Sequence, residues 1–202
     1  MKKETKGLGR LIFMEWAIPI FDYFSSLRKN EVIFEIVVPL VVAGVSTWVY
    51  MALEKATIAL DALADILPSA ISILIGFTVM FITLLLTSDT PAITRIKEEP
   101  TENVVRSKNI NLYQKLHIQL TESLFAEVLL LLTVFCYLFA KGIGICAILI
   151  VVILGIEVYL TLHILLSIIR STTHLYCVFY KTKKYENIPN GYMPLGIFTA
   201  RL

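Results

Sequence analysis

The sequence has little charge. Only 17% of its 202 residues are Asp, Glu, Lys or Arg, and the formal net charge is +2. A balance so close to neutral does not form the basic surface that nucleic-acid-binding proteins carry, so we expect no direct nucleic-acid contact.

The sequence also lacks the motifs that indicate an enzyme or a metalloprotein. Its three cysteines, Cys136, Cys146 and Cys177, have no metal-binding or redox spacing. We expect Cys136 and Cys146 to be small buried hydrophobic residues in preference to a disulfide. There is no H-E-x-x-H motif, no nucleophile elbow and no glycine-rich phosphate loop. The Glu-x-x-His repeat of di-metal helical bundles is also missing. We therefore expect a non-enzymatic protein with no metal and no other cofactor.

Apolar residues are abundant instead, at 57% of the chain, and they concentrate in four blocks. These blocks cover residues 32–53, 63–87, 118–140 and 143–169, and about 20 apolar helical residues suffice to cross a bilayer core of about 30 Å. The pattern predicts an all-α polytopic membrane four-helix bundle with up-down-up-down topology. The four-span domain covers residues 31–181, with a loop at 88–117, helical extensions beyond the membrane and a tail at 182–202.

The positions of the basic residues predict the orientation. Of the 18 Lys and Arg residues, six lie in 1–30, five in 88–117 and five after 169, whereas only Lys55 and Lys141 lie in the other two connections. The positive-inside rule therefore predicts both termini and the middle loop on the cytoplasmic side of the cytoplasmic membrane.

The N-terminal segment, residues 1–30, is expected to be cytoplasmic or interfacial. Within it, Glu15, Asp22, Ser26 and Lys29 recur at helical spacing over residues 8–29. This pattern fits an amphipathic helix in the membrane interface, and it fits a packed structural helix equally well.

The third and fourth spans form a hairpin joined by a turn at Lys141–Gly142, and they carry ionisable residues inside their apolar stretches. Folding the hairpin about residue 142 brings two pairs to equal depth, Glu122 with His163 and Glu127 with Glu157. Two carboxyl groups at one depth in a low dielectric do not readily both ionise, so we expect at least one of the second pair to be protonated, and such a pair can share a proton.

This intramembrane polar cluster, which Arg170 extends toward the cytoplasm, has two interpretations. It is either a buried polar network that holds the helices together or a pathway for protons or cations. In the first span, Glu35 lies one turn from the cytoplasmic end, and we expect it to extend to the interface.

A polar stripe follows the second span at steps of three, four and seven residues. It consists of Asp65, Ser69, Ser72, Gly76, Thr83 and Thr87. Such a stripe is expected to face protein or water, either as a seam between packed helices or as the lining of a pore in an oligomer.

The cytoplasmic side has the most sequence available for contact with a partner. Thr90–Pro91 predicts the start of a short helix over 91–99, and residues 101–110 have no firm signal. A new helix begins near Asn111 and runs into the third span. The candidate partner-docking residues are Arg95, Lys97, Glu98 and Glu99 in the loop, with His174 and Lys181 on the extended fourth helix.

This four-span plan is similar to that of small membrane proteins encoded in bacterial anti-phage systems, such as the membrane subunit of Kiwa. The resemblance covers the architecture of the whole chain and transfers no site residues. It implies an oligomer whose cytoplasmic face engages a soluble partner.

We therefore expect a homo-oligomeric membrane sensor or scaffold subunit that couples the bilayer to a soluble cytoplasmic protein, in a system such as anti-phage defence. The alternative is an oligomeric ion or proton channel, or a membrane-permeabilising effector. A membrane-bound enzyme is a third and weaker alternative.

Overall fold

The computed structural model describes residues 18–105, 108–144 and 146–186, and this part of the chain is mostly helical. Four helical segments are long and apolar enough to cross a membrane, namely Lys29–Ala52, Ala56–Thr87, Leu112–Ile143 and Ala147–Tyr176. The four predicted apolar spans are therefore confirmed as helices. Each is longer than predicted at one end or both, because helical sequence continues beyond the apolar blocks.

The first segment is built from three helical pieces in series. These are α3 (Lys29–Val32), the π-helical turn η2 (Ile33–Val37) and α4 (Val38–Ala52). Pro39 lies at the start of α4, and it has no N–H to donate to the carbonyl of Glu35 four residues earlier. The π-turn and the proline together leave that carbonyl available to another helix.

Helix α5 (Ala56–Thr87) follows a tight connection and runs back along the bundle. The connection between the first two apolar blocks, which contains Lys55, is therefore mostly helical. Helix α7 (Leu112–Ile143) continues through the predicted turn at Lys141–Gly142 and ends at Gly144, whose φ of 93° favours glycine. Helix α8 (Ala147–Glu186) begins directly afterwards. The turn prediction was wrong by a few residues because Gly142 fits within the helix and the positive φ is needed only at Gly144.

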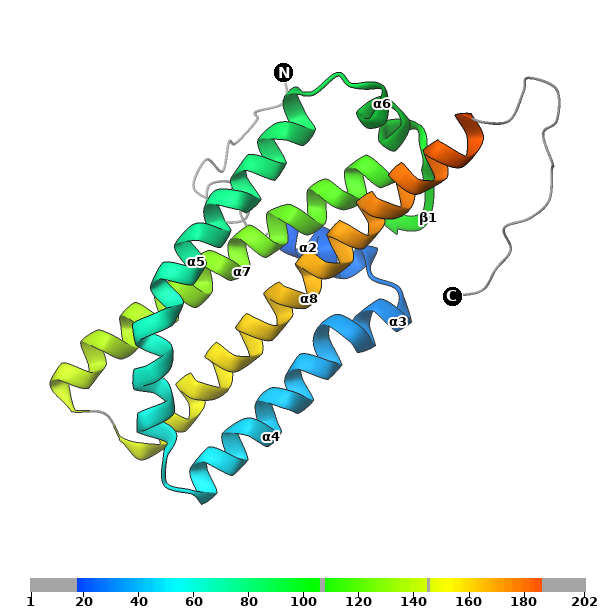
Figure 1. Cartoon of the computed structure of the whole chain (residues 1–202). Helices are drawn as coiled ribbons and strands as arrows, with labels where there is room; N and C mark the ends of the chain where they lie inside the picture. Colours follow the sequence, from blue (N-terminus) through cyan, green and yellow to red (C-terminus); the bar gives the residue numbers. More distant parts are fainter. Residues whose placement is uncertain (1–17, 106–107, 145, 187–202) are drawn as a thin grey trace, which may run out of the picture.

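Figure 1 shows the four long helices side by side, with two short connections at one end. The other end carries α6 (Pro91–Glu98) and an antiparallel hairpin of β1 (Pro100–Val105) and β2 (Lys108–Asn111). We call these two ends the short-loop end and the hairpin end. The hairpin corrects the all-α prediction. It was missed because its strands are short and mostly polar, with no alternating apolar pattern.

The hairpin is tied into the helices around it. The Thr90 hydroxyl accepts from the backbone N–H of Ile93 at 3.4 Å, which confirms the predicted start of α6. Asn111 caps α7 by accepting from the Gln114 N–H at 2.8 Å, and its side-chain amide donates to the Lys97 carbonyl at 2.9 Å. Helix α6 and the two strands thus pack over the hairpin end of the bundle.

Helix α2 (Ile18–Ser26) packs against α7 and β1, and residues 8–17 of the predicted helix over 8–29 lie outside the described residues. The chain turns after Ser26 and Lys29 starts a new helix, so these residues do not share one face, and Ser26 is buried. Glu15 lies outside the described residues. On the opposite side of α2, Phe21 and Phe24 are exposed.

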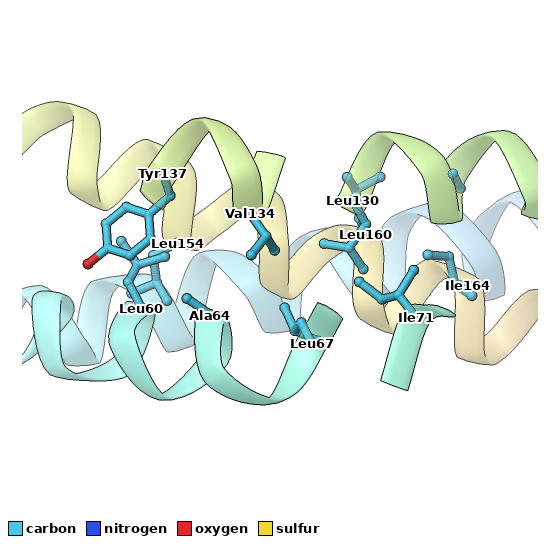
Figure 2. Packing of buried hydrophobic residues seen from close by; sticks show 11 residues of the cluster. Leu60, Ala64, Leu67, Ile71, Leu130, Val134, Tyr137, Leu154, Leu160 and Ile164 are labelled. Atoms are coloured by element: carbon cyan, nitrogen blue, oxygen red, sulfur yellow. The ribbon is translucent and has the colours of Figure 1, made fainter. Parts of the chain in front are cut away.

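Two apolar clusters form the core. The larger joins α5, α7 and α8 and reaches the short-loop end, and Figure 2 shows its side chains pointing toward one another between the three helices. The smaller lies at the hairpin end and combines α5, α6 and α7, with Leu85, Ile96 and Leu116 at its centre. The region between α2, η2, α7 and α8 is filled by polar side chains instead.

Candidate functional site

Six ionisable side chains meet inside the bundle, and we call them the charge cluster. They come from α3, η2, α7 and α8, and they are Glu31, Glu35, Lys115, Glu122, His163 and Arg170. Three of them, Glu122, His163 and Arg170, belong to the predicted intramembrane polar cluster. The other three join them only through the tertiary fold.

The pairing of Glu122 with His163 is confirmed. Because α7 and α8 run antiparallel from a short connection, the two residues lie at one level, with 2.9 Å between His163 Nε2 and Glu122 Oε1. Both side chains are buried. The same level holds further contacts between the two helices, since Gln119 donates to the Ser167 carbonyl at 2.9 Å and Ser123 donates to the Ser167 hydroxyl at 3.0 Å.

Arg170 connects the two glutamates of the first segment. Its Nε lies 2.6 Å from Glu35 Oε1, and its Nη1 lies 3.4 Å from Glu31 Oε2. Lys115 Nζ completes the group at 2.7 Å from Glu31 Oε1. Glu35 is fully buried, so the prediction that it extends to the interface was wrong. Arg170 on α8 and Tyr23 on α2 supply the partners of its carboxylate, and these offset the cost of burying it.

His163 also satisfies the backbone carbonyl that Pro39 leaves free. Its Nδ1 lies 2.8 Å from the Glu35 carbonyl oxygen. A proline inside a long apolar helix needs such a neighbour, because a buried carbonyl without a donor is costly. One imidazole therefore contacts both η2 and α7 from α8.

Helix α2 reaches the charge cluster through Tyr23, which is fully buried and donates its hydroxyl proton to Glu35 Oε2. Burial, together with the nearby Glu122 and Glu35 carboxylates, raises the pKa of the Tyr23 hydroxyl well above its ordinary value. Tyr23 thus remains a hydrogen-bond donor throughout the physiological range.

The hairpin reaches the charge cluster through Asn103. Its side-chain amide donates to the Ser26 carbonyl, and its Oδ1 lies 3.5 Å from Lys115 Nζ. The charge cluster therefore contacts α2 and β1, in addition to the helices that supply its six residues.

Glu127 and Glu157 do not form the predicted proton-sharing pair. Both are fully buried, but Glu127 accepts from the Thr78 hydroxyl on α5 at 2.8 Å. Neither carboxyl oxygen of Glu157 has a hydrogen-bond partner among the described residues. Equal depth did not produce a pair, because Glu127 turns toward α5.

The predicted polar stripe on α5 lies on the outside of the single chain. All six residues are exposed, and the face of α5 that packs in the core carries Leu60, Ala64, Leu67 and Ile71 instead. The hydroxyls of Ser72, Thr83 and Thr87 donate to carbonyls of their own helix. A packing seam within one chain is thus excluded, and contact with a second copy stays a prediction.

Only some of the predicted docking residues are exposed at the surface. Lys97 and Glu98 lie on the surface of α6, where Lys97 is 3.8 Å from Asp89 and lies over the Tyr113 ring. His174 is half-buried instead, and its Nε2 is buried with no hydrogen-bond partner in the described part of the chain.

Three predicted docking residues remain. Glu99 is half-buried, and the side chains of Arg95 and Lys181 lie outside the described residues. The docking role of these six residues therefore stays a prediction.

Two further observations concern the chemistry available. Cys136 and Cys146 are exposed, so the expectation that they are buried was wrong. Within residues 18–105, 108–144 and 146–186, no group of three or more His, Cys, Asp or Glu side chains is placed to hold a metal ion.

The chain matches no family model, no curated protein and no solved structure in the comparisons with known proteins. The interpretation therefore rests on the site itself. The charge cluster can bind and release protons, and it can hold five elements in one arrangement.

Sequence reasoning missed Tyr23, Glu31, Glu35 and Lys115 as members of this site. One signal was present: Glu31, Glu35 and Pro39 follow one another at steps of four, so two acids and a freed carbonyl lie on one face of the first segment. Which helix that face meets depends on the tertiary packing.

Proposed function

We propose that this protein is a non-enzymatic, multi-pass subunit of the cytoplasmic membrane, and that its hairpin end holds a soluble partner protein. The observation that carries the proposal is the charge cluster. It connects α2 and the hairpin with α7 and α8, so a displacement of the long helices is transmitted to the surface at the hairpin end.

The distribution of polar structure supports this proposal. The hairpin end carries α2, α6 and the β-hairpin, whereas the short-loop end has only brief connections. Sixteen of the 18 Lys and Arg residues lie in the segments that flank the hairpin end or in the termini, which favours a cytoplasmic position for that end. The exposed Phe21 and Phe24 of α2 fit contact with the membrane interface.

Cysteine labelling tests the orientation. In a variant in which the three native cysteines are replaced by serine, Lys55→Cys and Lys97→Cys place one thiol at each end of the bundle. A membrane-impermeant maleimide applied to intact cells is expected to label residue 55, and to label residue 97 only after permeabilisation. Labelling of residue 97 in intact cells would reverse the proposed orientation.

Crosslinking tests the partner. A photo-crosslinking amino acid at Glu98 or Val104, both exposed at the hairpin end, is expected to capture one soluble protein in native membranes. The same amino acid at Lys55 is the matched control and is expected to capture none. The captured protein, once purified, should bind the full-length chain in detergent, and it should lose affinity for a Lys97→Glu, Glu98→Lys double variant. Failure of the purified pair to bind would refute the proposal.

An oligomeric ion or proton channel is the second candidate, and the outward position of the α5 stripe favours it. A carboxylate on the outside of a membrane helix, as at Asp65, requires cover by other copies or by water in a lumen, and the hydroxyls of the stripe lie on the same face. If copies assemble around this stripe, Ser72→Leu is expected to abolish conductance in planar bilayers. Phe77→Leu, at an exposed position of α5 off the stripe, is the matched control. Equal currents from both variants would exclude this lumen.

The similarity of plan to subunits of anti-phage systems suggests the setting of the first candidate. Expressed with its captured partner, the chain is expected to lower phage plating efficiency, and Arg170→Met, which disconnects the charge cluster, is expected to restore it.

A further inference from the structure

The two hydrogen bonds of His163 require more protons than a neutral imidazole carries. Nδ1 lies 2.8 Å from the Glu35 carbonyl oxygen, and Nε2 lies 2.9 Å from Glu122 Oε1. A backbone carbonyl and an ionised carboxylate are both acceptors only, and a neutral imidazole has a single N–H. One additional proton must therefore lie on His163 or on Glu122.

The position of the first proton is settled by the backbone. The Glu35 carbonyl cannot donate, and Pro39 leaves it without its helical N–H partner, so Nδ1 must carry a hydrogen. The additional proton therefore belongs to the contact between Nε2 and Glu122. It is either on nitrogen, as an imidazolium beside a carboxylate, or on oxygen, as a carboxylic acid that donates to the ring.

The charges around the pair favour retention of this proton. The charge cluster holds three acids, Glu31, Glu35 and Glu122, against two cations, Lys115 and Arg170, and Arg28 lies next to Glu31 at the start of α3. One more proton, on His163 or on Glu122, removes the net negative charge of the cluster's own six side chains. An unmatched charge in a buried site is costly, and Glu35, Glu122 and His163 are all buried.

The other groups that face the pair do not replace the proton. Tyr159 stacks on the His163 ring with centroids 5.9 Å apart, and Tyr23 meets it edge-on at 6.1 Å. Tyr23 already donates to Glu35. Glu122 Oε2 is buried and has no hydrogen-bond partner among the described residues, so it receives no donor other than the shared proton.

We propose that His163 and Glu122 form a proton-binding site inside the bundle, and that the bound proton holds η2, α7 and α8 together. Loss of the proton turns the lone pair of Nε2 toward the Glu122 carboxylate and leaves the charge cluster with a net negative charge. The contact between α7 and α8 at this level then becomes repulsive. This site is independent of whether the hairpin end binds a partner.

Nitrogen NMR tests the site directly. The chain has only three histidines, so protein labelled with ¹⁵N-histidine in detergent micelles gives few signals, and His163→Gln identifies those of His163. At neutral pH we expect two protonated ring nitrogens, or an unprotonated Nε2 together with a protonated Glu122 carboxyl seen by ¹³C-glutamate labelling. An unprotonated Nε2 beside an ionised Glu122 would overturn the proposal.

A second variant keeps the test valid if His163→Gln does not fold. In Glu122→Gln the amide can donate to a neutral Nε2, so the ring needs no additional proton, and only the His163 signals are expected to move to neutral values.

Stability against pH gives a readout that a merely structural role would not change. Because the folded site binds a proton that the unfolded chain releases, the wild-type unfolding temperature is expected to fall as the pH rises from neutral to alkaline. The Glu122→Gln variant should show a smaller fall over the same range. Glu98→Gln, an exposed acid on α6, is the matched control and should follow the wild type. Identical pH profiles for the wild type and Glu122→Gln would refute the proposal.

Discussion

The two halves of the bundle hold buried acids in opposite ways. In the half near the hairpin end, Glu31 and Glu35 have charged or hydrogen-bonding partners from several helices. In the half near the short-loop end, Glu157 lies in the apolar cluster between α5, α7 and α8 with neither oxygen hydrogen-bonded within the described residues. Asp61, in the same half, stays near the surface and accepts from Tyr137 at 2.7 Å and Lys141 at 2.5 Å.

This difference shows where a helical bundle can bury charge. At the hairpin end α2, η2, α7 and α8 converge, so one carboxylate finds donors on several of them. Toward the short-loop end α4 packs mainly against α8, and an open apolar groove of about 540 Å³ lies between the two helices. Gly155 of α8 is within van der Waals reach of Thr47 of α4. Fewer elements meet at this end, so Glu157 has fewer possible donors, and burying its charged form would be costly.

The first prediction has the largest expected effect and concerns the half near the hairpin end. Arg170→Met removes the charge that both Glu31 and Glu35 contact, and it keeps most of the apolar volume. Because uncompensated buried acids remain, we expect the free energy of unfolding in detergent to fall by about 3–5 kcal/mol. Lys141→Met, which breaks the exposed pair with Asp61 at the other end, should change it little. Equal losses in denaturant titrations would show that the two halves do not differ as described.

The second prediction concerns the isolated acid. Glu157→Met replaces a buried carboxyl that has no partner with an apolar side chain of similar size. We expect the free energy of unfolding to rise by about 1–3 kcal/mol, because the desolvation cost disappears. The same substitution at Glu35 should lower stability, since it strips Arg170 of its 2.6 Å contact. If Glu157→Met is destabilising, Glu157 has a favourable interaction in the folded protein, for example with a bound ion.

The third prediction has the smallest expected effect. It concerns Glu127, which lies between the two halves and accepts one hydrogen bond, from the Thr78 hydroxyl. Thr78→Val removes that donor and retains the shape of the side chain, so we expect a loss of about 1 kcal/mol in the free energy of unfolding. Thr83→Val on the same helix is the control, because its exposed hydroxyl bonds only to the Val79 carbonyl. A loss from Thr83→Val as large as that from Thr78→Val would argue that the Thr78–Glu127 bond contributes nothing specific.

Several features of the fold and site followed from local sequence. Four apolar blocks predicted four long helices, and Thr90 and Asn111 predicted where α6 and α7 begin. The Glu122–His163 contact followed from the geometry of a helical hairpin, because two antiparallel helices joined by a short turn bring residues equidistant from that turn to one level. Each of these results depends on periodicity, capping or chain connectivity, which a single sequence displays directly.

What the sequence left undecided was the direction of each polar side chain around its helix axis. Depth alone paired Glu127 with Glu157, but rotation of α7 turned Glu127 to Thr78. The burial of Glu35 and the outward position of the α5 stripe were likewise decided by packing. The approach of α2 and the first segment to α8 is a contact between residues far apart in the chain, and no local pattern encodes it. The sequence by itself therefore determined the helices and their order, whereas the tertiary structure decided which acids share a charge cluster, because a buried charge is stable only where separate elements bring donors to it.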